Sequence, residues 1–387
     1  MTTQSPKIML VAGEPSGDRL GASLMAAIKH RLANVTFVGV GGTAMADEGL
    51  KSALPIGDLA VMGLVEVIPR IPQLARHIRN TAAQARQERP DVLVTIDAPG
   101  FNFRLARRLA GTDIPRVHYV APSVWAWKPG RAKKIAPLFD HLLALLPFEP
   151  PFFETVGLPT TFVGHPAVEQ DQHGDAVGFR KRNAVSDQAD VLVVLPGSRR
   201  SEVDRLLPIF AETVQRVCAN RPDLRIVVPT VEHVQGIVSQ SVRQWPGAPI
   251  VVTGDDARRD AFATATAALA ASGTVSVELA LAGVPAVIGY DVNKVSAAIA
   301  KRLVKTDYVS LVNILLKRAA VPEYLLGKCR ADLLAPAVTE LLDNPDSRET
   351  QRQAYRTALD LLKPPGGLPS EVAADVVINL LKQKEAA

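Results

Sequence analysis

The chain alternates short apolar runs rich in β-branched residues with longer amphipathic segments, and this alternation constrains its fold more than any other feature. Such strands are buried on both faces, which is typical of a parallel sheet covered by helices. The first part of the chain is therefore predicted to form β-α repeats around one parallel sheet. Its apolar runs are KIMLVAG (7–13), VTFVGVGG (35–42), DVLVTID (91–97), RVHYVAP (116–122) and HLLALLP (141–147).

The same rhythm returns in the second half of the chain. Helical stretches at 202–220 and 274–282 lie between its apolar runs. The expected fold class is therefore α/β, with two Rossmann-like domains. The runs of the second half are VLVVLPGSR (191–199), RIVVPTV (225–231), PIVVTG (249–254), AALAASG (267–273) and PAVIGY (285–290).

Polar stretches and sharp breaks set the expected domain boundaries. Residues 164–190 are polar and lack a strand pattern at first, which places the junction near 160–170. Beyond about residue 330 the pattern is helical only, and KPPGGLP (363–369) precedes a last amphipathic helix at 370–384. We expect an N-terminal domain, a C-terminal domain and a final helix that crosses back onto the N-terminal domain. Their ranges are 1–165, 166–362 and 363–387.

Composition excludes several classes of protein. The chain has 387 residues, 47% of them hydrophobic, which is enough for two cores. Lys and Arg outnumber Asp and Glu by 44 to 39, a modest excess that favours phosphorylated substrates or an anionic membrane surface. The basic residues are scattered in pairs, so nucleic-acid binding is not expected. Cys218 and Cys329 have no partners at metal-ligand spacing, so neither a disulfide framework nor a zinc site is predicted.

No secretory or membrane-spanning segment is predicted. The N-terminus runs directly into a strand-like segment, and Pro, Gly or a charge interrupts every apolar run before it reaches bilayer length. We therefore expect a cytoplasmic protein whose membrane contact is peripheral.

The first candidate motif is GEPSGD (13–18), which closes a strand and opens a helix. Ligands of open parallel sheets bind beyond the carboxyl ends of the strands, where backbone amides at Ser16 and Gly17 can meet an anion or a sugar hydroxyl. The alternative is an ordinary strand-to-helix turn capped by Ser16 or Asp18.

The second motif is DAPGFN (97–102), at the end of an otherwise apolar strand. A carboxylate held there can remove a proton, and inverting glycosyl transfer needs a base to deprotonate the acceptor hydroxyl. Asp97 is therefore the candidate base and Asn102 a candidate substrate ligand. The alternative is that Asp97 caps the next helix.

The third motif is APSVWAWKPGR (121–131), with Trp125 and Trp127 close together beside Lys128 and Arg131. Indole faces can stack on sugar rings, and the basic groups can meet a phosphate. The alternative is that both tryptophans fill a core.

The fourth motif is LPGSRRSEV (195–203), a strand that runs into a Gly-Ser turn and a helix. Helix-terminal amides and a guanidinium can converge on a diphosphate there. The candidates are Gly197, Ser198, Arg199 and Arg200. The motif lacks the GxxxxGK[ST] pattern, which disfavours a P-loop nucleotidase.

The fifth and most specific motif is ASGTVSVELALAGVPAVIGY (271–290). A strand ends at Ser272 and Gly273, and a helix begins near Thr274, whose hydroxyl and the helix amides can bind phosphate. Glu278, one turn later, can accept hydrogen bonds from ribose hydroxyls. A capping box explains less, because Glu278 follows Thr274 by four residues rather than three.

Two absences from the sequence complete this interpretation. There is no DxD tripeptide to hold a metal-bound diphosphate, and no HExxH or Cys/His cluster. No metal or cofactor is therefore expected, and the leaving diphosphate must be neutralised by arginine and helix dipoles.

These motifs together resemble the lipid-A-disaccharide synthases, over residues 7 to about 380. The resemblance implies a GT-B architecture with two sheets facing a central cleft that domain closure completes. It also implies inverting transfer of 2,3-diacylglucosamine from UDP to 2,3-diacylglucosamine 1-phosphate. The blocks that carry it are GEPSGD, VGVGG with the following Met45, MGLVEVI (62–68), IDAPGFN, SVWAWKPGR, PFEPPFF (147–153), GHP (164–166), LPGSRRSEV, SGTVSVELALAGVP, VSLVNILL (309–316) and PEYL (322–325).

The resemblance also implies roles for particular residues. It makes Asp97 the base, assigns UDP to Glu278 and to Arg199 or Arg200, and brings Asn313 to the same cleft. The chain departs from the expected pattern at Pro15, where Ala is expected, and at Gly100, where an acid is expected. Asp97 must then act alone or with Glu14 or Asp18.

Residues 61–79 are interpreted as an interfacial patch that admits acyl chains on the cytoplasmic face of the inner membrane. The alternative is an ordinary core-facing helix. The resemblance further suggests a homodimer. The apolar residues of the patch are Leu64, Val65, Val67, Ile68, Ile71, Leu74 and Ile78, with Arg70, Arg76 and Arg79.

Two other functions fit the same fold. One is a UDP-N-acetylglucosamine 2-epimerase or a lipid-carrier glycosyltransferase of peptidoglycan assembly, against which the DAPGFN and SVWAWK blocks argue. The other is a non-catalytic nucleotide-sugar-binding protein, against which the retained Asp97 weighs.

Overall fold

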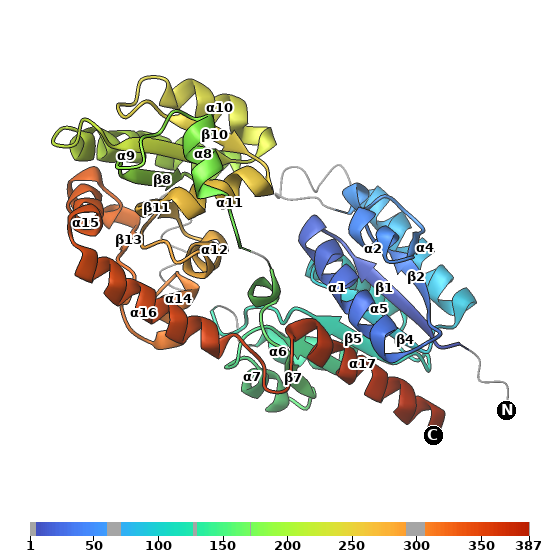
Figure 1. Ribbon diagram of the computed structural model, residues 1–387. Helices are drawn as coiled ribbons and strands as arrows, with labels where there is room; N and C mark the ends of the chain where they lie inside the picture. Colours follow the sequence, from blue (N-terminus) through green and yellow to red (C-terminus); the bar gives the residue numbers. More distant parts are fainter. Residues whose placement is uncertain (1–4, 60–70, 127–129, 171, 292–305, 387) are drawn as a thin grey trace. The chain divides into compact units, whose positions relative to one another are not determined.

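The computed structural model describes residues 5–59, 71–126, 130–170, 172–291 and 306–386 (Figure 1). Contacts divide the chain into two compact units. The N-terminal unit comprises residues 1–169 and 362–387, and the C-terminal unit comprises residues 170–361. The sequence placed the two junctions after residues 165 and 362.

The N-terminal unit is built on a parallel sheet with the strand order β3-β2-β1-β4-β5-β6-β7. The order reverses between β1 and β4, which pair from Ile8 with Val92 to Ala12 with Ile96. Ligands of doubly wound sheets bind at such a switch point, beyond the carboxyl ends of the strands. The strands are β1 (Lys7–Ala12), β2 (Thr36–Val40), β3 (Lys51–Ser52), β4 (Val92–Ile96), β5 (Arg116–Tyr119), β6 (His141–Ala144) and β7 (Thr160–Phe162).

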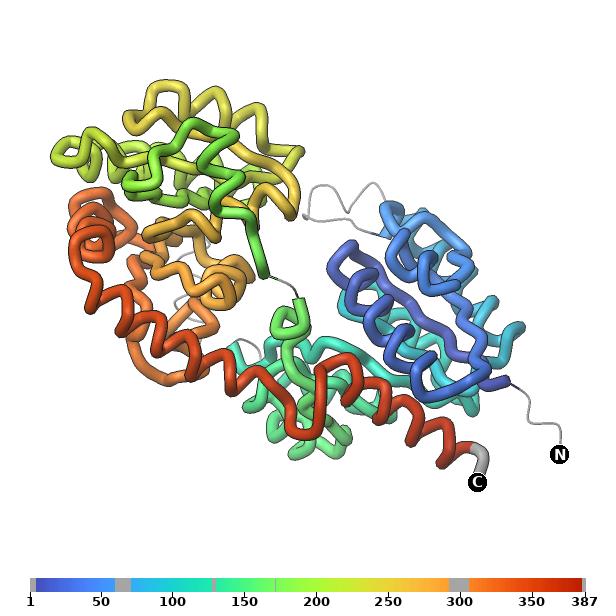
Figure 2. The backbone as a smooth tube through the Cα atoms, in the orientation of Figure 1, coloured from blue at the N-terminus to red at the C-terminus, as the bar shows by residue number. Residues whose placement is uncertain are grey.

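Helices cover both faces of this sheet. One face packs on α1 and α17, and α17 runs beside α1 (Figure 2). The opposite face packs on α4 and α5. The last helix therefore packs within the N-terminal unit. The helices are α1 (Pro15–Arg31), α2 (Thr43–Asp47), α4 (Ile71–Glu88), α5 (Pro99–Arg108), α6 (Arg131–Ile135), α7 (Pro150–Glu154) and α17 (Pro369–Ala386).

The C-terminal unit has a second parallel sheet with the strand order β10-β9-β8-β11-β12-β13. Its order reverses between β8 and β11, where Ala267 lies opposite Leu192. The strand β13 was not predicted, because three residues carry too little periodicity. The strands are β8 (Val191–Leu195), β9 (Arg225–Thr230), β10 (Ile250–Thr253), β11 (Ala267–Ala271), β12 (Ala286–Tyr290) and β13 (Glu323–Leu325).

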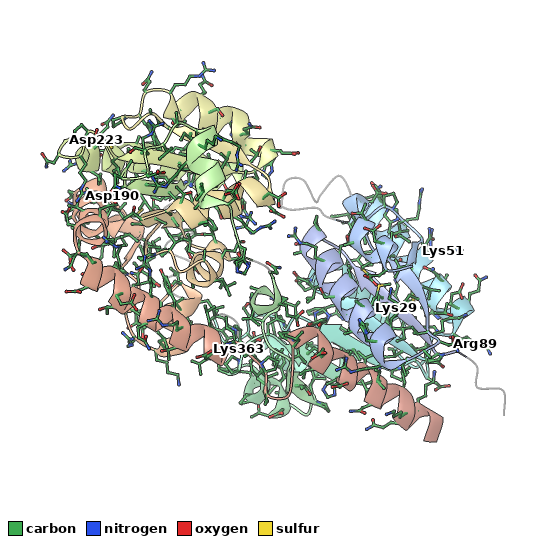
Figure 3. All side chains as sticks on the ribbon, in the orientation of Figure 1. Lys29, Lys51, Arg89, Asp190, Asp223 and Lys363 are labelled. Carbon is green, nitrogen blue, oxygen red and sulfur yellow. The ribbon has the colours of Figure 1, made fainter. Side chains whose placement is uncertain are left out.

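The helices of the C-terminal unit pack on its sheet through an aliphatic core centred on the buried Phe210 of α9. Lys29, Lys51, Arg89 and Asp223 are among the charged residues that lie exposed at the surface (Figure 3). The helices are α8 (Ala176–Arg182), α9 (Arg200–Cys218), α10 (Glu232–Val242), α11 (Asp255–Thr264), α12 (Val275–Leu281), α14 (Leu311–Leu316), α15 (Ala331–Asp343) and α16 (Pro345–Leu361).

Two features are absent from the described residues. None of their helices is long and apolar enough to cross a membrane. Nor do they contain a group of three or more His, Cys, Asp or Glu side chains that could hold a metal ion.

Candidate active site

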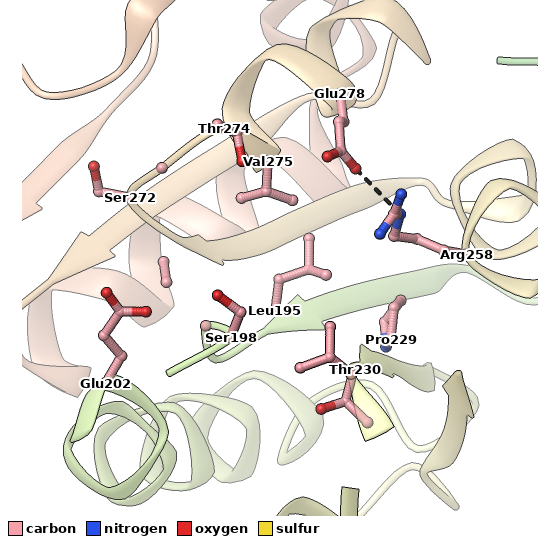
Figure 4. A pocket seen from close by; sticks show the side chains of 14 residues that line it. Leu195, Ser198, Glu202, Pro229, Thr230, Arg258, Ser272, Thr274, Val275 and Glu278 are labelled. Atoms are coloured by element: carbon pink, nitrogen blue, oxygen red, sulfur yellow. Dashed lines mark ion pairs between the residues drawn. The ribbon is translucent and has the colours of Figure 1, made fainter. Parts of the chain in front are cut away.

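A pocket opens at the switch point of the C-terminal sheet, beyond the carboxyl ends of β8, β9 and β11 (Figure 4). It gathers two of the predicted motifs, because parallel strands end at the same edge of a sheet. Its lining residues are Leu195, Gly197, Ser198, Glu202, Pro229, Thr230, Val231, Arg258, Ala271, Ser272, Gly273, Thr274, Val275 and Glu278.

The turn from β11 into α12 forms one wall of this pocket. Gly273 has φ 152°, a conformation that side-chain-bearing residues avoid, and it turns the chain into a helix that begins at Val275. The Ser276 hydroxyl donates to the Gly273 carbonyl over 2.9 Å and holds the turn. Amides at the start of the helix and the Thr274 side chain are thereby placed at the pocket, where partial positive charge favours an anion.

Glu278 lies one turn into α12 and is held by an arginine that sequence reasoning missed. Arg258 Nε lies 3.1 Å from Glu278 Oε2, and Arg258 Nη2 lies 3.0 Å from Asp255 Oδ1. Arg258 belongs to α11, so no spacing within one motif signals the contact. The pair leaves an oriented carboxylate at the pocket wall.

The turn from β8 into α9 forms the facing wall. Gly197 has φ 108°, and the carbonyl of Ser198 accepts a hydrogen bond of 2.7 Å from His233 Nε2. Glu202 also lines the pocket, and its carboxylate pairs with Arg199 Nη1 over 2.9 Å. Sequence reasoning missed both Glu202 and His233. His233 belongs to α10, outside the motif, whereas Glu202 lies within it, three residues after Arg199.

Neither predicted diphosphate arginine is among the pocket-lining residues of the described chain. Arg199 is paired with Glu202, and Arg200 Nε lies 3.0 Å from Asp204 Oδ2. Both side chains are well exposed, at 64% and 71%, so both are able to swing toward a ligand.

Asn313 corrects an expectation of the resemblance. Its side chain is fully buried, donates to the carbonyl of Val321 and to Glu323 Oε1, and accepts the amides of Ala320 and Val321, all at 2.8 Å. These bonds fix the segment that leads into β13. In this structure both polar atoms of the Asn313 side chain are engaged by these bonds, and Asn313 is not among the residues that line the pocket.

In the N-terminal unit, two predicted motifs meet at the β1–β4 switch point. Gly13 closes β1, and a Cβ added there would lie 2.5 Å from the Ala98 Cβ after β4. Only glycine permits this approach. The GEPSGD and DAPGFN turns therefore lie side by side, although more than eighty positions separate them in the sequence.

Asp97 stands on a strained turn. Asp97 and Ala98 have φ 47° and 43°, two consecutive non-glycine residues in the left-handed region. Such strain clusters at functional sites and persists only when surrounding contacts impose it. The Asp97 side chain is half-buried, and burial raises the pKa of its carboxyl above the ordinary value.

Asn102 holds this turn rather than binding substrate, which corrects its predicted role. It is fully buried, and its Nδ2 donates to the carbonyls of Asp97 at 2.7 Å and Ile96 at 3.1 Å. Its Oδ1 is buried and finds no hydrogen-bond partner among the described residues. Burial excludes direct contact with a ligand.

Asp18 is likewise structural, contrary to its predicted catalytic role. It is 5% exposed, and its carboxylate accepts the amides of Gly42 at 2.7 Å, Ala44 at 3.0 Å and Met45 at 3.1 Å. Those amides begin α2, so Asp18 caps that helix from α1.

The remaining residues of GEPSGD flank the start of α1. Glu14 is the half-buried N-cap and Ser16 is exposed, so both remain candidates, while Gly17 is buried against Ile96. Pro15, one of the two departures from the expected pattern, stands at the first helical position, where proline is favourable. The other, Gly100, is exposed in the first turn of α5.

Trp125 is anchored by a buried carboxylate. Its Nε1 donates to Glu149 Oε1 over 3.1 Å, and its ring meets Phe148 edge-on with centroids 5.1 Å apart. Glu149 is 3% exposed and also accepts the Leu146 amide at 3.0 Å. Burial raises the pKa of Glu149 to about 7. The predicted Trp127 and Lys128 lie outside the described residues.

The predicted acyl patch is described only at its end. Ile71 is 53% exposed, whereas Leu74 packs against the core beneath α4. Leu74 therefore agrees with the alternative interpretation, an ordinary helix that faces the core. The other members, Leu64, Val65, Val67 and Ile68, lie outside the described residues.

Two doubly wound units, one with a pocket at its switch point and the other with a strained carboxylate, define a two-domain protein of the GT-B fold class. Solved structures show the same fold. A Neisseria meningitidis UDP-GlcNAc 2-epimerase bound to UDP-GlcNAc aligns with TM-score 0.60 and 12% identity, covering 98% of this chain and 100% of that one. The glycosyltransferase of kitacinnamycin aligns with TM-score 0.63 and 18% identity, again covering 98% and 100%.

Comparison of sequences identifies one family, whereas the fold is shared by several classes of enzyme. A family model described as lipid-A-disaccharide synthetase matches residues 8–375. The chain is 50% identical over 384 residues to a lipid-A-disaccharide synthase of Rhodospirillum centenum, covering 98% of this chain and 96% of that protein. It is 50% identical over 382 residues to a lipid-A-disaccharide synthase of Paramagnetospirillum magneticum, covering 97% of this chain and 98% of that protein. This chain belongs to the lipid-A-disaccharide synthase family, so the resemblance inferred from its motifs is confirmed.

Proposed function

We propose that the protein transfers 2,3-diacylglucosamine from UDP to the 6-hydroxyl of 2,3-diacylglucosamine 1-phosphate, with Asp97 as the base. Membership of a disaccharide-forming glycosyltransferase family carries the reaction class. The observation that carries the site is the strained, half-buried Asp97 at the β1–β4 switch point.

In this mechanism the pocket of the C-terminal unit binds UDP. The turn at Gly273 and the start of α12 receive the diphosphate, whose charge Arg199 or Arg200 also neutralises as UDP departs. Ser272, Thr274, Gly197 and Ser198 add hydrogen-bond donors around it. Glu278 accepts the ribose hydroxyls.

The N-terminal unit is the acceptor half. The Asp97 carboxylate takes the proton of the acceptor 6-hydroxyl while that oxygen bonds to the anomeric carbon. The bond from the anomeric carbon to the diphosphate breaks with inversion, and UDP leaves with the electron pair. Glu14 and Ser16 position the acceptor beside Asp97, and Trp125 offers an indole face to a sugar ring.

The same proposal includes a membrane surface. Acylated substrates reside in a bilayer, and the exposed Ile71 at the start of α4 extends the apolar sequence of residues 61–68. Peripheral contact at the cytoplasmic face of the inner membrane would supply both lipids. A homodimer is the assembly that the family resemblance suggests.

The test is UDP release by purified protein given UDP-2,3-diacylglucosamine with and without 2,3-diacylglucosamine 1-phosphate, with the lipid product analysed by mass spectrometry. Acceptor-dependent UDP release and a disaccharide product are expected. Absence of release with this pair, together with turnover of plain UDP-N-acetylglucosamine, would instead establish an epimerase.

A further inference from the structure

We propose that Arg258 is a positioning residue that makes the nucleotide site selective for ribose, by holding the carboxylate of Glu278 in place. The inference rests on the proposed UDP site and deepens it. Neither sequence motifs nor the family resemblance pointed to Arg258.

The geometry sets Arg258 between two carboxylates. Its Nε lies 3.1 Å from Glu278 Oε2 and its Nη2 lies 3.0 Å from Asp255 Oδ1. Figure 4 shows the guanidinium pointing from α11 toward Glu278 on α12. The Glu278 and Arg258 side chains are 25% and 32% exposed, and both line the pocket.

Stability alone accounts poorly for this arrangement. Partly exposed ion pairs contribute little to the free energy of folding, so the chain gains little stability from the pair as such. The pair contributes more to ligand binding, because it orders the Glu278 side chain before the ligand arrives. A glutamate side chain that is already ordered loses less conformational entropy when a ligand binds.

Arg258 contacts only one of the two carboxylate oxygens of Glu278, which fits a positioning role. The guanidinium engages Oε2, which leaves Oε1 to accept a hydrogen bond from a ribose hydroxyl. A carboxylate oxygen binds a hydroxyl donor more strongly than a neutral acceptor does.

The chain offers a matched control in the next residue. Arg259 lies in the same helix, its side chain is also 32% exposed, and it pairs with Asp256 at the same i,i+3 spacing that Arg258 uses for Asp255. Arg259 does not line the pocket. R259Q therefore removes a comparable charge and ion pair without touching Glu278.

The experiment measures dissociation constants of UDP and of 2′,3′-dideoxy-UDP by calorimetry. The proteins are the full chain and its R258Q, R258K, E278Q and R259Q variants. We expect the unchanged protein to prefer UDP by at least about tenfold, the value of one or more charge-assisted hydrogen bonds. R258Q and E278Q should lose most of this preference while binding the dideoxy compound within about threefold of the unchanged protein. R258K should retain part of it, and R259Q all of it.

Other outcomes overturn the inference. An unaltered preference in R258Q would show that Glu278 needs no positioning. Equal weakening of UDP and its dideoxy analogue, with UMP affected less, would make Arg258 a diphosphate ligand instead. Absence of UDP binding by the unchanged protein would contradict the proposed UDP site itself. If the unchanged protein bound UDP and R258Q kept the full preference for UDP over 2′,3′-dideoxy-UDP, only the role of Arg258 would be refuted.

Discussion

The side-chain amide of Asn102 donates a 2.7 Å hydrogen bond to the main-chain carbonyl of Asp97. The bond fastens the first turn of α5 to the end of β4, at the point where two consecutive residues adopt positive φ. The strained position of the proposed base is thus imposed by a buried neighbour that never meets the substrate.

Replacing Asn102 with Leu should therefore damage turnover more than nucleotide binding. We expect kcat to fall at least about tenfold, because small displacements of a base are costly, with UDP affinity unchanged. The free energy of unfolding should drop by about 1–3 kcal/mol, since buried carbonyls lose their donor. Asn183→Leu removes a comparable 2.9 Å bond, to the Phe179 carbonyl in the C-terminal unit, and should lower stability without a specific loss of kcat.

Asp97→Asn should abolish general-base catalysis while leaving UDP binding intact. A positioned base contributes about 10²–10⁴-fold, so kcat should fall by that factor. Steady-state kinetics and UDP calorimetry measure the two effects separately. Asp91→Asn, at the other end of β4, is the control. Full activity in the Asp97 variant would refute the assignment.

The pH dependence of turnover follows from the same carboxyl. Burial raises the pKa of Asp97 above its ordinary value of 3.8, and only its ionised form accepts the proton. Activity should therefore decline as pH falls through this raised pKa. The acid limb of the kcat/KM profile in stable buffers measures it, and a limb at or below the ordinary value would contradict the buried setting.

Glu149 should make the fold less stable as pH rises. Its pKa is raised by burial from 4.5 to about 7, so between these values the unfolded chain is ionised while the folded protein still binds the proton. Its contribution is complete below pH 4.5 and is lost as pH rises to 7, by about 3 kcal/mol at 1.36 kcal/mol per pH unit.

Glu149→Gln isolates this effect. The amide cannot accept both the Trp125 and Leu146 hydrogens, so the variant should be about 1 kcal/mol less stable at pH 4.5. At pH 8 it should be about 2 kcal/mol more stable. Denaturant unfolding across this range gives the difference curve. Burial lowers the pKa values of His118 and His165 to about 3 and 4. Their contributions to the pH dependence of stability cancel in the difference curve, because both proteins contain them.

Asp18→Ala should act through folding rather than chemistry. Losing the acceptor for three amides at the start of α2 should cost about 1–3 kcal/mol. Thermal unfolding and kcat per folded molecule distinguish the two roles. A large loss of kcat with unchanged stability would restore Asp18 to the catalytic group.

The pattern of apolar runs predicted the two sheets closely. The run at 191–199 contains β8, and the stretches at 202–220 and 274–282 correspond to α9 and α12. It also placed Asp97, Gly273 and Glu278 at strand ends and helix starts, where they lie. Such features depend on local periodicity and turn chemistry, which a single sequence displays.

The sequence by itself determined the alternation of strands and helices in both halves and the candidate residues that stand where the longer strands end. Only the tertiary structure decided that β1 lies beside β4, bringing Gly13 against Ala98, and that Arg258 meets Glu278 across α11 and α12. It also placed the side chains of Asn102, Asp18 and Asn313, which the sequence offers as candidate catalytic or binding residues, in buried positions. The physical reason is that burial and hydrogen-bond partners come from residues distant in sequence, which no local pattern records.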